Sequence, residues 1–325
     1  MKDFLLLAMK KFLESRWVPR KPLLIGYSGG PDSKALLYLL LECRRFLPLD
    51  LHLAHIDHGW REESGREAAA LAEEAERLNL PFYLQTLKKE SFASGNLEEQ
   101  GRNFRCQFFG ELYRSLHCQA LLLGHQADDQ AEVVLKRVFE GSSLFAISSI
   151  SLESFVMDMQ VWRPLLPFPK RQLLSWLSEK NLSYIQDATN LSDRFLRGKM
   201  RLEMIPLLEA SFGKDVTSNL CQLGEESRDI RNYFSTLNRS ILKSVLQDAE
   251  GVSRLDLNPF FPLSAIQLKY LLKEWLKQEG MVFSRQILDG VIAGLLGGRE
   301  EKKFQSKRGL LSVKNRMLIL RKSSY

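Results

Sequence analysis

The first 150 residues alternate between two patterns of hydrophobic and polar positions. Short apolar runs predict strands buried in a parallel sheet, because such strands are covered by helices on both faces. These runs lie at residues 23–27, 51–56, 82–87 and 120–123. Between them, apolar residues recur at helical spacing over residues 33–46, 62–78, 97–116 and 128–140. Strand and helix in regular alternation predict an α/β fold with a doubly wound, mostly parallel sheet.

The pattern changes after about residue 160. Helical spacing returns at residues 170–180, and the polar stretch that follows, ending at Arg201, predicts an irregular segment. Residues 215–280 have a helical pattern, whereas residues 281–325 are mixed and close on short strands. The later part of the chain therefore does not continue the alternation of the first part.

A chain of 325 residues is long enough for about two domains. We predict a first domain at residues 1–213 and a smaller, helical or α+β domain at residues 214–325. In the second, the sequence GLLSVKNRMLILR (309–321) interleaves apolar with charged residues and predicts a pair of strands.

The net charge of +7 is distributed unevenly along the chain. Residues 301–325 hold eight Lys or Arg and one acid, Glu301, so the rest of the chain is neutral. A neutral body with a basic end favours a polyanionic partner such as nucleic acid. The alternative is a basic segment that serves only solubility.

Composition excludes several classes of protein. The 45% apolar and 26% charged residues are typical of a folded globular chain and exclude wholesale disorder. No apolar run is long enough to span a membrane, and the N-terminus lacks the pattern of a signal peptide. The four cysteines form no CxxC pair, which argues against a zinc ribbon or an iron–sulfur centre and predicts reduced thiols in the cytoplasm.

The strongest motif, Gly-Tyr-Ser-Gly-Gly-Pro-Asp-Ser-Lys at residues 26–34, joins the first predicted strand to the first predicted helix. Its glycines allow close approach of a phosphate, its serine hydroxyls can donate, and the helix start presents N–H groups. The candidate ATP-binding residues are Ser28, Gly29, Gly30, Pro31, Asp32 and Ser33. Asp32 would repel a bare phosphate, so we expect it to hold Mg²⁺ bound to that phosphate. The alternative is a turn that caps the helix without a ligand.

This loop resembles the SGGxDS loop of the PP-loop ATP pyrophosphatases and lacks the Walker A and dinucleotide-binding patterns. The resemblance implies a fold like that of the adenine nucleotide alpha hydrolases. It also implies cleavage of ATP to AMP and pyrophosphate, with adenylation of an oxygen atom on a second substrate.

Three further stretches discriminate among such enzymes. They are Ala-His-Ile-Asp-His-Gly (54–59), Gly-His-Gln-Ala-Asp-Asp-Gln-Ala-Glu (124–132), and residues 187–208, which begin Asp-Ala-Thr-Asn. With the loop, they resemble the tRNA(Ile)-lysidine synthetase family. The resemblance implies an ATP-dependent ligase that joins L-lysine to C2 of the wobble cytidine in tRNA(Ile) with a CAU anticodon. The product reads AUA instead of AUG and is charged with isoleucine instead of methionine.

The second stretch supplies candidate catalytic carboxylates. His125, Asp129 and Glu132 are spaced i, i+4 and i+7, which predicts one face of a helix, with Asp128 pointing elsewhere. Asp129 and Glu132 could pair with the charged groups of lysine, hold Mg²⁺ (Asp129, with Asp32) or accept a proton. The alternative is a solvated acidic start of a helix.

Two histidines and two arginines complete the predicted catalytic region. His55 and His58 follow the second strand, where a base or ribose would lie, and His55 and His125 are assigned to the nucleotide. Arg102 and Arg105 lie one helical turn apart and suit phosphate or carboxylate contacts. Gly101 and Cys106 depart here from the alanine and tyrosine usual in the family.

Basic residues near an aromatic one predict contact with an RNA loop. The candidates are Arg194, Arg197, Lys199 and Arg201, near Phe195, together with Lys307 and Arg308 in the basic C-terminal segment. Gly198 and Lys199 stand where the family has Asn and Arg. The alternative for the first group is a salt-bridged helix start.

Other functions were weighed against the ligase. A tRNA thiolase of the same superfamily needs a persulfide cysteine or cluster ligands at a suitable spacing, which the chain lacks. A small-metabolite amidoligase leaves the basic C-terminal segment unexplained. A non-catalytic, nucleotide-dependent RNA-binding protein does not need Asp32, Asp129 and Glu132. The sequence leaves open whether the chain forms a homodimer.

Overall fold

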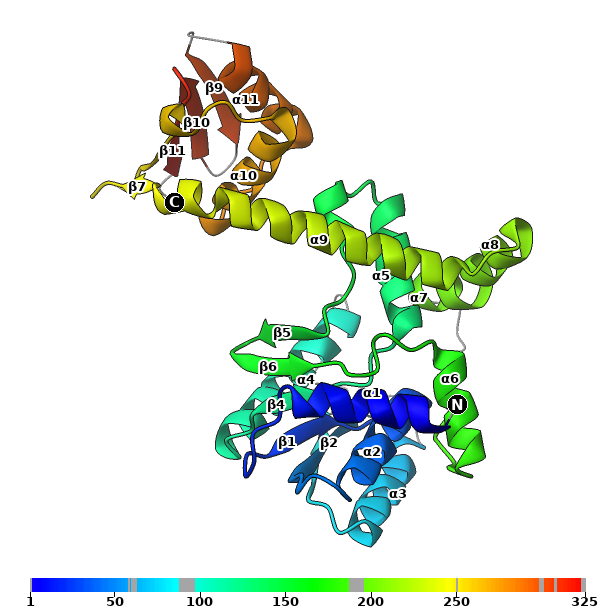
Figure 1. Cartoon of the computed structure of the whole chain (residues 1–325). Coiled ribbons are helices and arrows are strands. Elements are labelled where there is room, and N and C mark those ends of the chain that lie inside the picture. The colour runs from blue at the N-terminus through cyan, green and yellow to red at the C-terminus, as the bar shows by residue number, and fades with distance from the viewer. Residues whose placement is uncertain are drawn as a thin grey trace. The chain divides into compact units, whose positions relative to one another are not determined.

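The alternating strands and helices of the first part form a single six-stranded sheet in the computed structural model of the chain (Figure 1). The structure describes residues 2–57, 59, 63–87, 97–186, 196–249, 251–297, 301–306 and 309–322. The chain divides into two compact units by its contacts. The first unit comprises residues 1–141 and 149–224, and the second unit comprises residues 142–148 and 225–325. The functional division predicted at 213/214 stays a prediction.

The sheet of the first unit has the strand order β3-β2-β1-β4-β6-β5. All neighbouring strands are parallel except β5, which pairs antiparallel with β6 at the edge. The strands are β1 (Leu23–Gly26), β2 (Leu51–Asp57), β3 (Phe82–Thr86), β4 (Ala120–Leu122), β5 (Glu153–Val156) and β6 (Met159–Trp162). The predicted doubly wound, mostly parallel α/β fold is confirmed.

Helices connect these strands, and every predicted helix between residues 33 and 180 lies within three residues of its expected bounds. They are α1 (Lys2–Glu14), α2 (Pro31–Cys43), α3 (Ser64–Arg77), α4 (Leu97–Ser115), α5 (Ala127–Phe139) and α6 (Lys170–Glu179). Helix α1 and the β5–β6 hairpin were not predicted.

The segment before Arg201 differs from its prediction. We expected an irregular segment, but the described residues from Leu196 onward are helical. They form α7 (Leu196–Lys199), a π-helical turn η4 (Met200–Met204) and α8 (Ile205–Phe212). The many charged residues hid this helix, because its buried face is narrow and rests on Met200 and Ile205.

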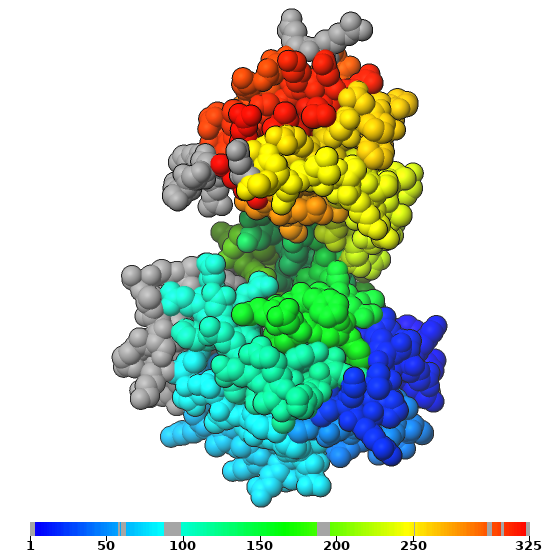
Figure 2. Space-filling view, turned by 90° about the vertical axis from the view of Figure 1, so that its left-hand side faces the viewer, coloured from blue at the N-terminus to red at the C-terminus, as the bar shows by residue number. Residues whose placement is uncertain are grey.

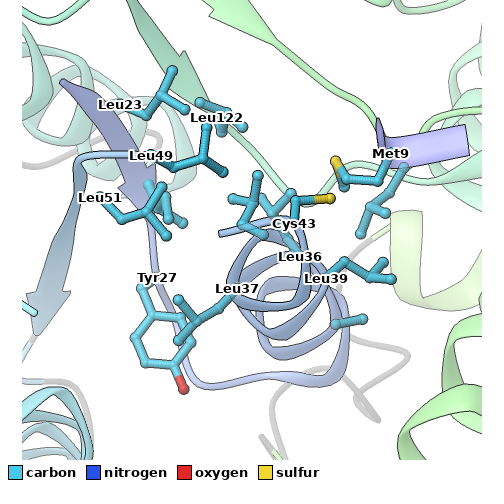
Figure 3. Close-up of a cluster of buried hydrophobic side chains, with 14 of the residues drawn as sticks. Met9, Leu23, Tyr27, Leu36, Leu37, Leu39, Cys43, Leu49, Leu51 and Leu122 are labelled. Carbon is cyan, nitrogen blue, oxygen red and sulfur yellow. The ribbon is translucent and has the colours of Figure 1, made fainter. Parts of the chain in front are cut away.

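The main core of the first unit lies between its sheet and helices α1 and α2. Leu36 and Leu39 of α2 are fully buried between strand residues such as Leu23 and Met9 of α1 (Figure 3). An uninterrupted apolar helix such as α2 needs cover on more than one side, and α1 supplies the second side. The core therefore fixes α2, and with it the loop at the start of α2.

The second unit is built on an antiparallel sheet with the order β7-β8-β11-β10-β9. Its elements are α9 (Val216–Lys243, shared with the first unit), β7 (Leu246–Gln247), β8 (Ser253–Asp256), α10 (Ala265–Gln278), α11 (Arg285–Gly297), β9 (Lys302–Ser306), β10 (Gly309–Lys314) and β11 (Met317–Lys322). The predicted strand pair is confirmed as the β10–β11 hairpin. The helical pattern expected over 215–280 is interrupted by β7 and β8, so that part of the prediction was wrong.

One face of this second sheet is buried. Alternate residues of β10 and β11, such as Leu311 and Leu320, pack with Trp275 of α10 and Val291 of α11. The basic residues Lys302, Lys314 and Arg321 are exposed. In Figure 2 the orange and red C-terminal residues form part of the visible surface of this unit. The architecture thus leaves basic side chains in contact with solvent.

The contribution of the α2 core can be tested with two leucines. Leu36→Ala should lower the free energy of unfolding by about 2–5 kcal/mol, because it leaves a cavity at a fully buried position. Leu7→Ala on α1, where the side chain is 63% exposed, should change it by less than about 0.5 kcal/mol. Urea denaturation followed by circular dichroism measures both. Equal losses in the two variants would contradict this description of the core.

Candidate active site

The candidate site lies at the carboxyl edge of the parallel sheet, where β1 and β4 are neighbours. In the sheet, β2 lies beside β1, on the side away from β4, and β6 lies beside β4, on the side away from β1. Ligands of open α/β sheets bind outside such a switch in strand order, because the loops there diverge and leave a crevice. The motifs around residues 26–34 and 124–132 follow β1 and β4, so both open onto this edge.

The loop after β1 is held by its own hydrogen bonds. The Ser33 hydroxyl accepts from the Ser28 N–H at 3.2 Å and donates to the Gly30 carbonyl at 3.0 Å. The N-cap of α2 is Gly30, which offers no side-chain acceptor, and Pro31 begins the helix. The N–H groups at the N-terminus of α2 thus have no side-chain cap, and an anion could bind them.

Two glycines permit close packing around this loop. Gly29 has φ +75°, and a Cβ atom there would lie 2.7 Å from side-chain atoms of Leu71 and Ile185. A Cβ atom on Gly124 would lie 2.9 Å from the carbonyl carbon of Asp32. The backbone after β4 therefore lies directly against the first turn of α2. This contact brings the two motifs together.

A buried polar cluster supports the loop from behind. Glu74 of α3 accepts hydrogen bonds from the Tyr27 hydroxyl at 2.5 Å and the Tyr38 hydroxyl at 2.8 Å, and it pairs with the Lys34 ammonium. These contacts tie the end of β1 and the start of α2 to α3. This cluster was not predicted from the sequence, because Glu74 is one of several acids on a helix rich in charged residues.

Asp32 is a buried carboxylate in need of a cation. Its Oδ1 atom is buried without a hydrogen-bond partner among the described residues. Burial raises the pKa of Asp32 to about 6, a shift that Lys170 opposes and Asp129 reinforces. An ionised carboxylate here is destabilised unless a positive charge joins it.

The donor set fits Mg²⁺ bound through a substrate phosphate. No group of three or more His, Cys, Asp or Glu side chains gathers as a complete ligand set in the part of the chain that the structure describes. Mg²⁺ usually takes one or two carboxylates and completes its shell with phosphate oxygens and water. Asp32 matches that requirement, because its Oδ1 atom has no partner among the described residues and because the charge of a second carboxylate, Asp129, acts on it.

Asp129 and Glu132 lie together on α5 with Arg201 against them. The Arg201 guanidinium is 2.6 Å from Glu132 Oε1 and 3.4 Å from Asp129 Oδ1. Burial raises the pKa of Glu132, which is 2% exposed, although Arg201 opposes the shift. Arg201, which the sequence grouped with RNA-binding residues, thus contacts the candidate catalytic carboxylates in this structure.

Asp128 and His125 belong to the same motif, but Asp128 lies on α5 and His125 lies in the loop before it. Asp128 points away from this pair, as expected, and accepts from the Lys170 N–H at 2.8 Å at the start of α6. His125 was expected on the helix face, but α5 begins at Ala127, so His125 belongs to the loop before it. The helix start is fixed instead by a capping box between Gln126 and Asp129.

Both described histidines of the motifs are uncharged at neutral pH. Burial lowers the pKa of His125 to about 4, a shift that Asp129 opposes, and its Nδ1 atom is buried without a partner among the described residues. Burial also lowers the pKa of His55, whose Nδ1 lies 2.8 Å from the Tyr27 carbonyl. Neutral rings suit contacts to a base or ribose.

Several arginines lie around His125. Arg102 and Arg105 on α4 and Arg197 on α7 are exposed, and the charges of Arg105 and Arg197 act on His125. Arg163, which directly follows β6, acts on it too and is buried. Arg163 was not predicted as a site residue, because a single arginine in the apolar run Trp-Arg-Pro-Leu-Leu gives no spacing signal.

Some predicted residues lie elsewhere. Lys199 is exposed on α7. His58, Arg194, Lys307 and Arg308 lie outside the described residues, as do residues 187–195 of the third motif.

Comparison with known proteins supports the motif resemblance. A family model described as a PP-loop domain matches residues 5–208. The chain is 35% identical over 303 residues to a tRNA(Ile)-lysidine synthase of Chlamydia pneumoniae, covering 93% of this chain and 91% of that protein. The chain belongs to the tRNA(Ile)-lysidine synthase family. Its predicted class, a PP-loop enzyme of the ligase type that uses ATP, is confirmed.

Other likenesses agree with this family. A tRNA(Ile)-lysidine synthase of Protochlamydia amoebophila (strain UWE25) is 37% identical over 280 residues, which are 86% of this chain but 61% of that longer protein. Among solved structures, the U34-tRNA thiolase NcsA from Methanococcus maripaludis, described with its [4Fe-4S] cluster, has a TM-score of 0.56. It is 18% identical and covers 70% of this chain and 80% of its own, a likeness of fold alone.

Among the described residues, no helix combines the length and apolar character needed to cross a bilayer.

The buried charge of Asp32 predicts a stability that depends on pH. Because its pKa is raised from 3.8 to about 6, the folded state binds the proton more tightly than the unfolded state. Stability from this group is therefore lost as pH rises from about 4 to about 6. Without nucleotide and with EDTA, the free energy of unfolding of Asp32→Asn at pH 8 should exceed that of the wild type by up to about 3 kcal/mol. Near pH 4 the free energies of unfolding of the two proteins should be almost equal.

The matched control is Asp158→Asn, because Asp158 is exposed in the β5–β6 turn. It should match the wild type at every pH. Urea denaturation across this pH range measures all three proteins. An Asp32→Asn variant that is less stable than the wild type at pH 8 would contradict the electrostatic account.

Proposed function

We propose that this chain ligates L-lysine to C2 of the wobble cytidine in tRNA(Ile) bearing a CAU anticodon, at the expense of ATP. An adenylated cytidine is the intermediate, AMP and pyrophosphate leave, and lysidine is the product. This proposal is supported chiefly by the packing of Gly124 against Asp32, because the loop at residues 28–33 and the motif that carries Asp129 and Glu132 thereby meet. A nucleotide and an amine can thus meet at one edge.

The loop at residues 28–33 binds the phosphates of ATP. The open N-terminus of α2 attracts the anion, and Gly29 and Gly30 place no side chain in its way. Asp32, with Asp129, would hold Mg²⁺. When bound, that ion neutralises phosphate charge and improves pyrophosphate as a leaving group.

The base is activated at its ring carbonyl. That oxygen is a poor leaving group until it attacks the α-phosphorus of ATP and carries AMP. His55 and His125 are neutral and close to the two sides of the loop, so they can contact the nucleoside without repelling Mg²⁺. The lysine amine then attacks C2, and AMP departs with the oxygen.

The carboxylates on α5 serve the amine. Asp129 and Glu132 already hold one cation, the Arg201 guanidinium, so their surroundings favour a positively charged partner. Glu132, whose pKa is raised by burial, suits the role of accepting the proton released by the attacking amine.

The tRNA is held by basic residues around the site and in the second unit. Arg105 and Arg197 are exposed near His125, Arg102 is exposed on the same helix as Arg105, and Arg194 and Lys199 belong with Arg197 to the predicted RNA-binding group. Lys307 and Arg308 extend this contact to the C-terminal segment, whose net charge of +7 attracts phosphates.

The thiolase alternative gains no support. No disulfide joins any of the four cysteines, all of which lie in the described part of the chain, and burial raises the pKa of Cys43 and Cys118 to about 11. Such thiols are protonated at neutral pH and poorly suited to carry sulfur.

The proposed reaction can be tested with labelled lysine. Label should enter precipitated RNA only when ATP, magnesium and the unmodified CAU tRNA(Ile) are all present. Asp32→Asn should abolish incorporation while tRNA binding persists, because the phosphate site loses its cation ligand. Asp158→Asn should retain full activity. If ATP is cleaved to AMP and pyrophosphate but no lysine enters the RNA, the lysidine assignment is wrong.

The role of the basic C-terminal segment can be tested by charge reversal. The double change Lys307→Glu with Arg308→Glu should weaken tRNA binding and lower the slope of log affinity against log salt by about 2. ATP cleavage with saturating tRNA should be little affected. The matched control, Lys11→Glu with Lys21→Glu, alters net charge equally in the first unit. Equal effects of both pairs on filter-binding affinity and slope would show that the segment is not specific.

A further inference from the structure

Arg163 lies at the carboxyl edge of the sheet, on the far side of β4 from the phosphate loop. Its N–H donates to the Leu152 carbonyl at 2.8 Å, and the preceding Trp162 carbonyl accepts from Leu123 N–H at 3.0 Å. Leu123 begins the segment that leads to His125. Arg163 is therefore held level with the start of the catalytic motif that follows β4.

The side chain of Arg163 is buried but only partly satisfied. It is 8% exposed, and its Nη1 donates to the Ser151 carbonyl at 3.0 Å and the Ser154 hydroxyl at 2.9 Å. Its Nε is buried without a partner, and no carboxylate pairs with the guanidinium among the described residues. Buried guanidinium groups normally have an anionic partner, because desolvation of an unpaired charge is costly.

The charges around Arg163 reinforce this need. Burial and the positive charge of Arg102 both lower the pKa of Arg163. Arg163 in turn acts on His125, along with Arg105 and Arg197. The surroundings of this buried guanidinium are thus positive, and a bound anion would relieve the repulsion.

The position of Arg163 distinguishes among the anions of the reaction. The ATP phosphates belong at β1 and α2, and β6 lies two strands away, about 10 Å across the sheet. The tRNA phosphates are too bulky for a buried group and are matched by the exposed Arg102, Arg105 and Arg197. A small carboxylate remains.

We propose that Arg163 binds the α-carboxylate of the free lysine substrate and so selects an amino acid over other amines. This inference rests on the proposed function. Ser151 and Ser154 hold Nη1 and leave Nε available to the carboxylate. A diamine or an amide without that carboxylate leaves the buried guanidinium unpaired, and it is rejected for that reason.

The test compares L-lysine with L-lysinamide, in which a neutral amide replaces the carboxylate. With saturating ATP and tRNA, the wild type should favour lysine in kcat/KM by about 10- to 100-fold, as expected for a hydrogen-bonded charge. Arg163→Met should bring the two amines close to parity by lowering kcat/KM for lysine alone. The KM values for ATP and tRNA should not change.

The matched control is Arg171→Met, because Arg171 is exposed on α6 and pairs only with Asp215 among the described residues. It should keep the preference for lysine. If Arg163→Met fails to fold, Ser154→Ala keeps the guanidinium and removes one of its anchors. That variant should raise the KM for lysine without affecting lysinamide.

Four results would overturn the inference. In the first, Arg163→Met or Ser154→Ala lowers kcat/KM for lysine and for lysinamide equally. In the second, either variant raises only the KM for ATP or for tRNA, which would assign Arg163 to a phosphate. If the wild type incorporates lysine and Arg163→Met keeps the same preference for lysine over lysinamide, the inference about Arg163 is wrong and the proposed function stands. Failure of the wild type to incorporate any lysine would overturn the proposed function, and this inference with it.

Discussion

The close contact between the backbone after β4 and the first turn of α2 is the constraint on which the candidate site depends. Parallel pairing of β1 with β4 sets the two strands side by side, and Gly124 lets the following loop reach Asp32. Any side chain at Gly124 would meet backbone atoms, which cannot move aside as a flexible side chain can. The motifs proposed for phosphate binding and for amine chemistry, about 100 residues apart in the sequence, thereby share one edge of the sheet.

The site holds charges that folding alone would disfavour. Asp32 is a buried carboxylate whose pKa is raised, and Arg163 is a buried guanidinium whose pKa is lowered. Each lacks a full set of partners among the described residues, and in the proposed function each would meet a group of opposite charge. Asp129 and Glu132 differ from them, because the Arg201 guanidinium already contacts both carboxylates. The unpaired charges of Asp32 and Arg163 lower the free energy of unfolding, and ligands of opposite charge that bind the folded state would raise it again.

The sequence predicted the parts of the fold that local pattern determines. Strands β1, β2 and β4 were found because buried parallel strands are apolar runs, and β3 was found as well, although it is an edge strand without a buried residue. The β5–β6 hairpin was missed, because β5 is a half-exposed edge strand and the turn at Met157-Asp158 has positive φ without glycine. In the site, the PP-loop was predictable from its motif. The pairing of Arg201 with Glu132 was not, because contacts between distant segments leave no local pattern.

The central claim is that ATP activates the ring carbonyl of the wobble cytidine at this edge. The most direct test places ¹⁸O in that carbonyl and examines the AMP released during ligation by mass spectrometry. Adenylation of the carbonyl predicts that AMP carries the ¹⁸O, because the C2–O bond breaks when lysine attacks. Unlabelled AMP, formed while lysine still enters the tRNA, would show that ATP activates some other group and would contradict the account.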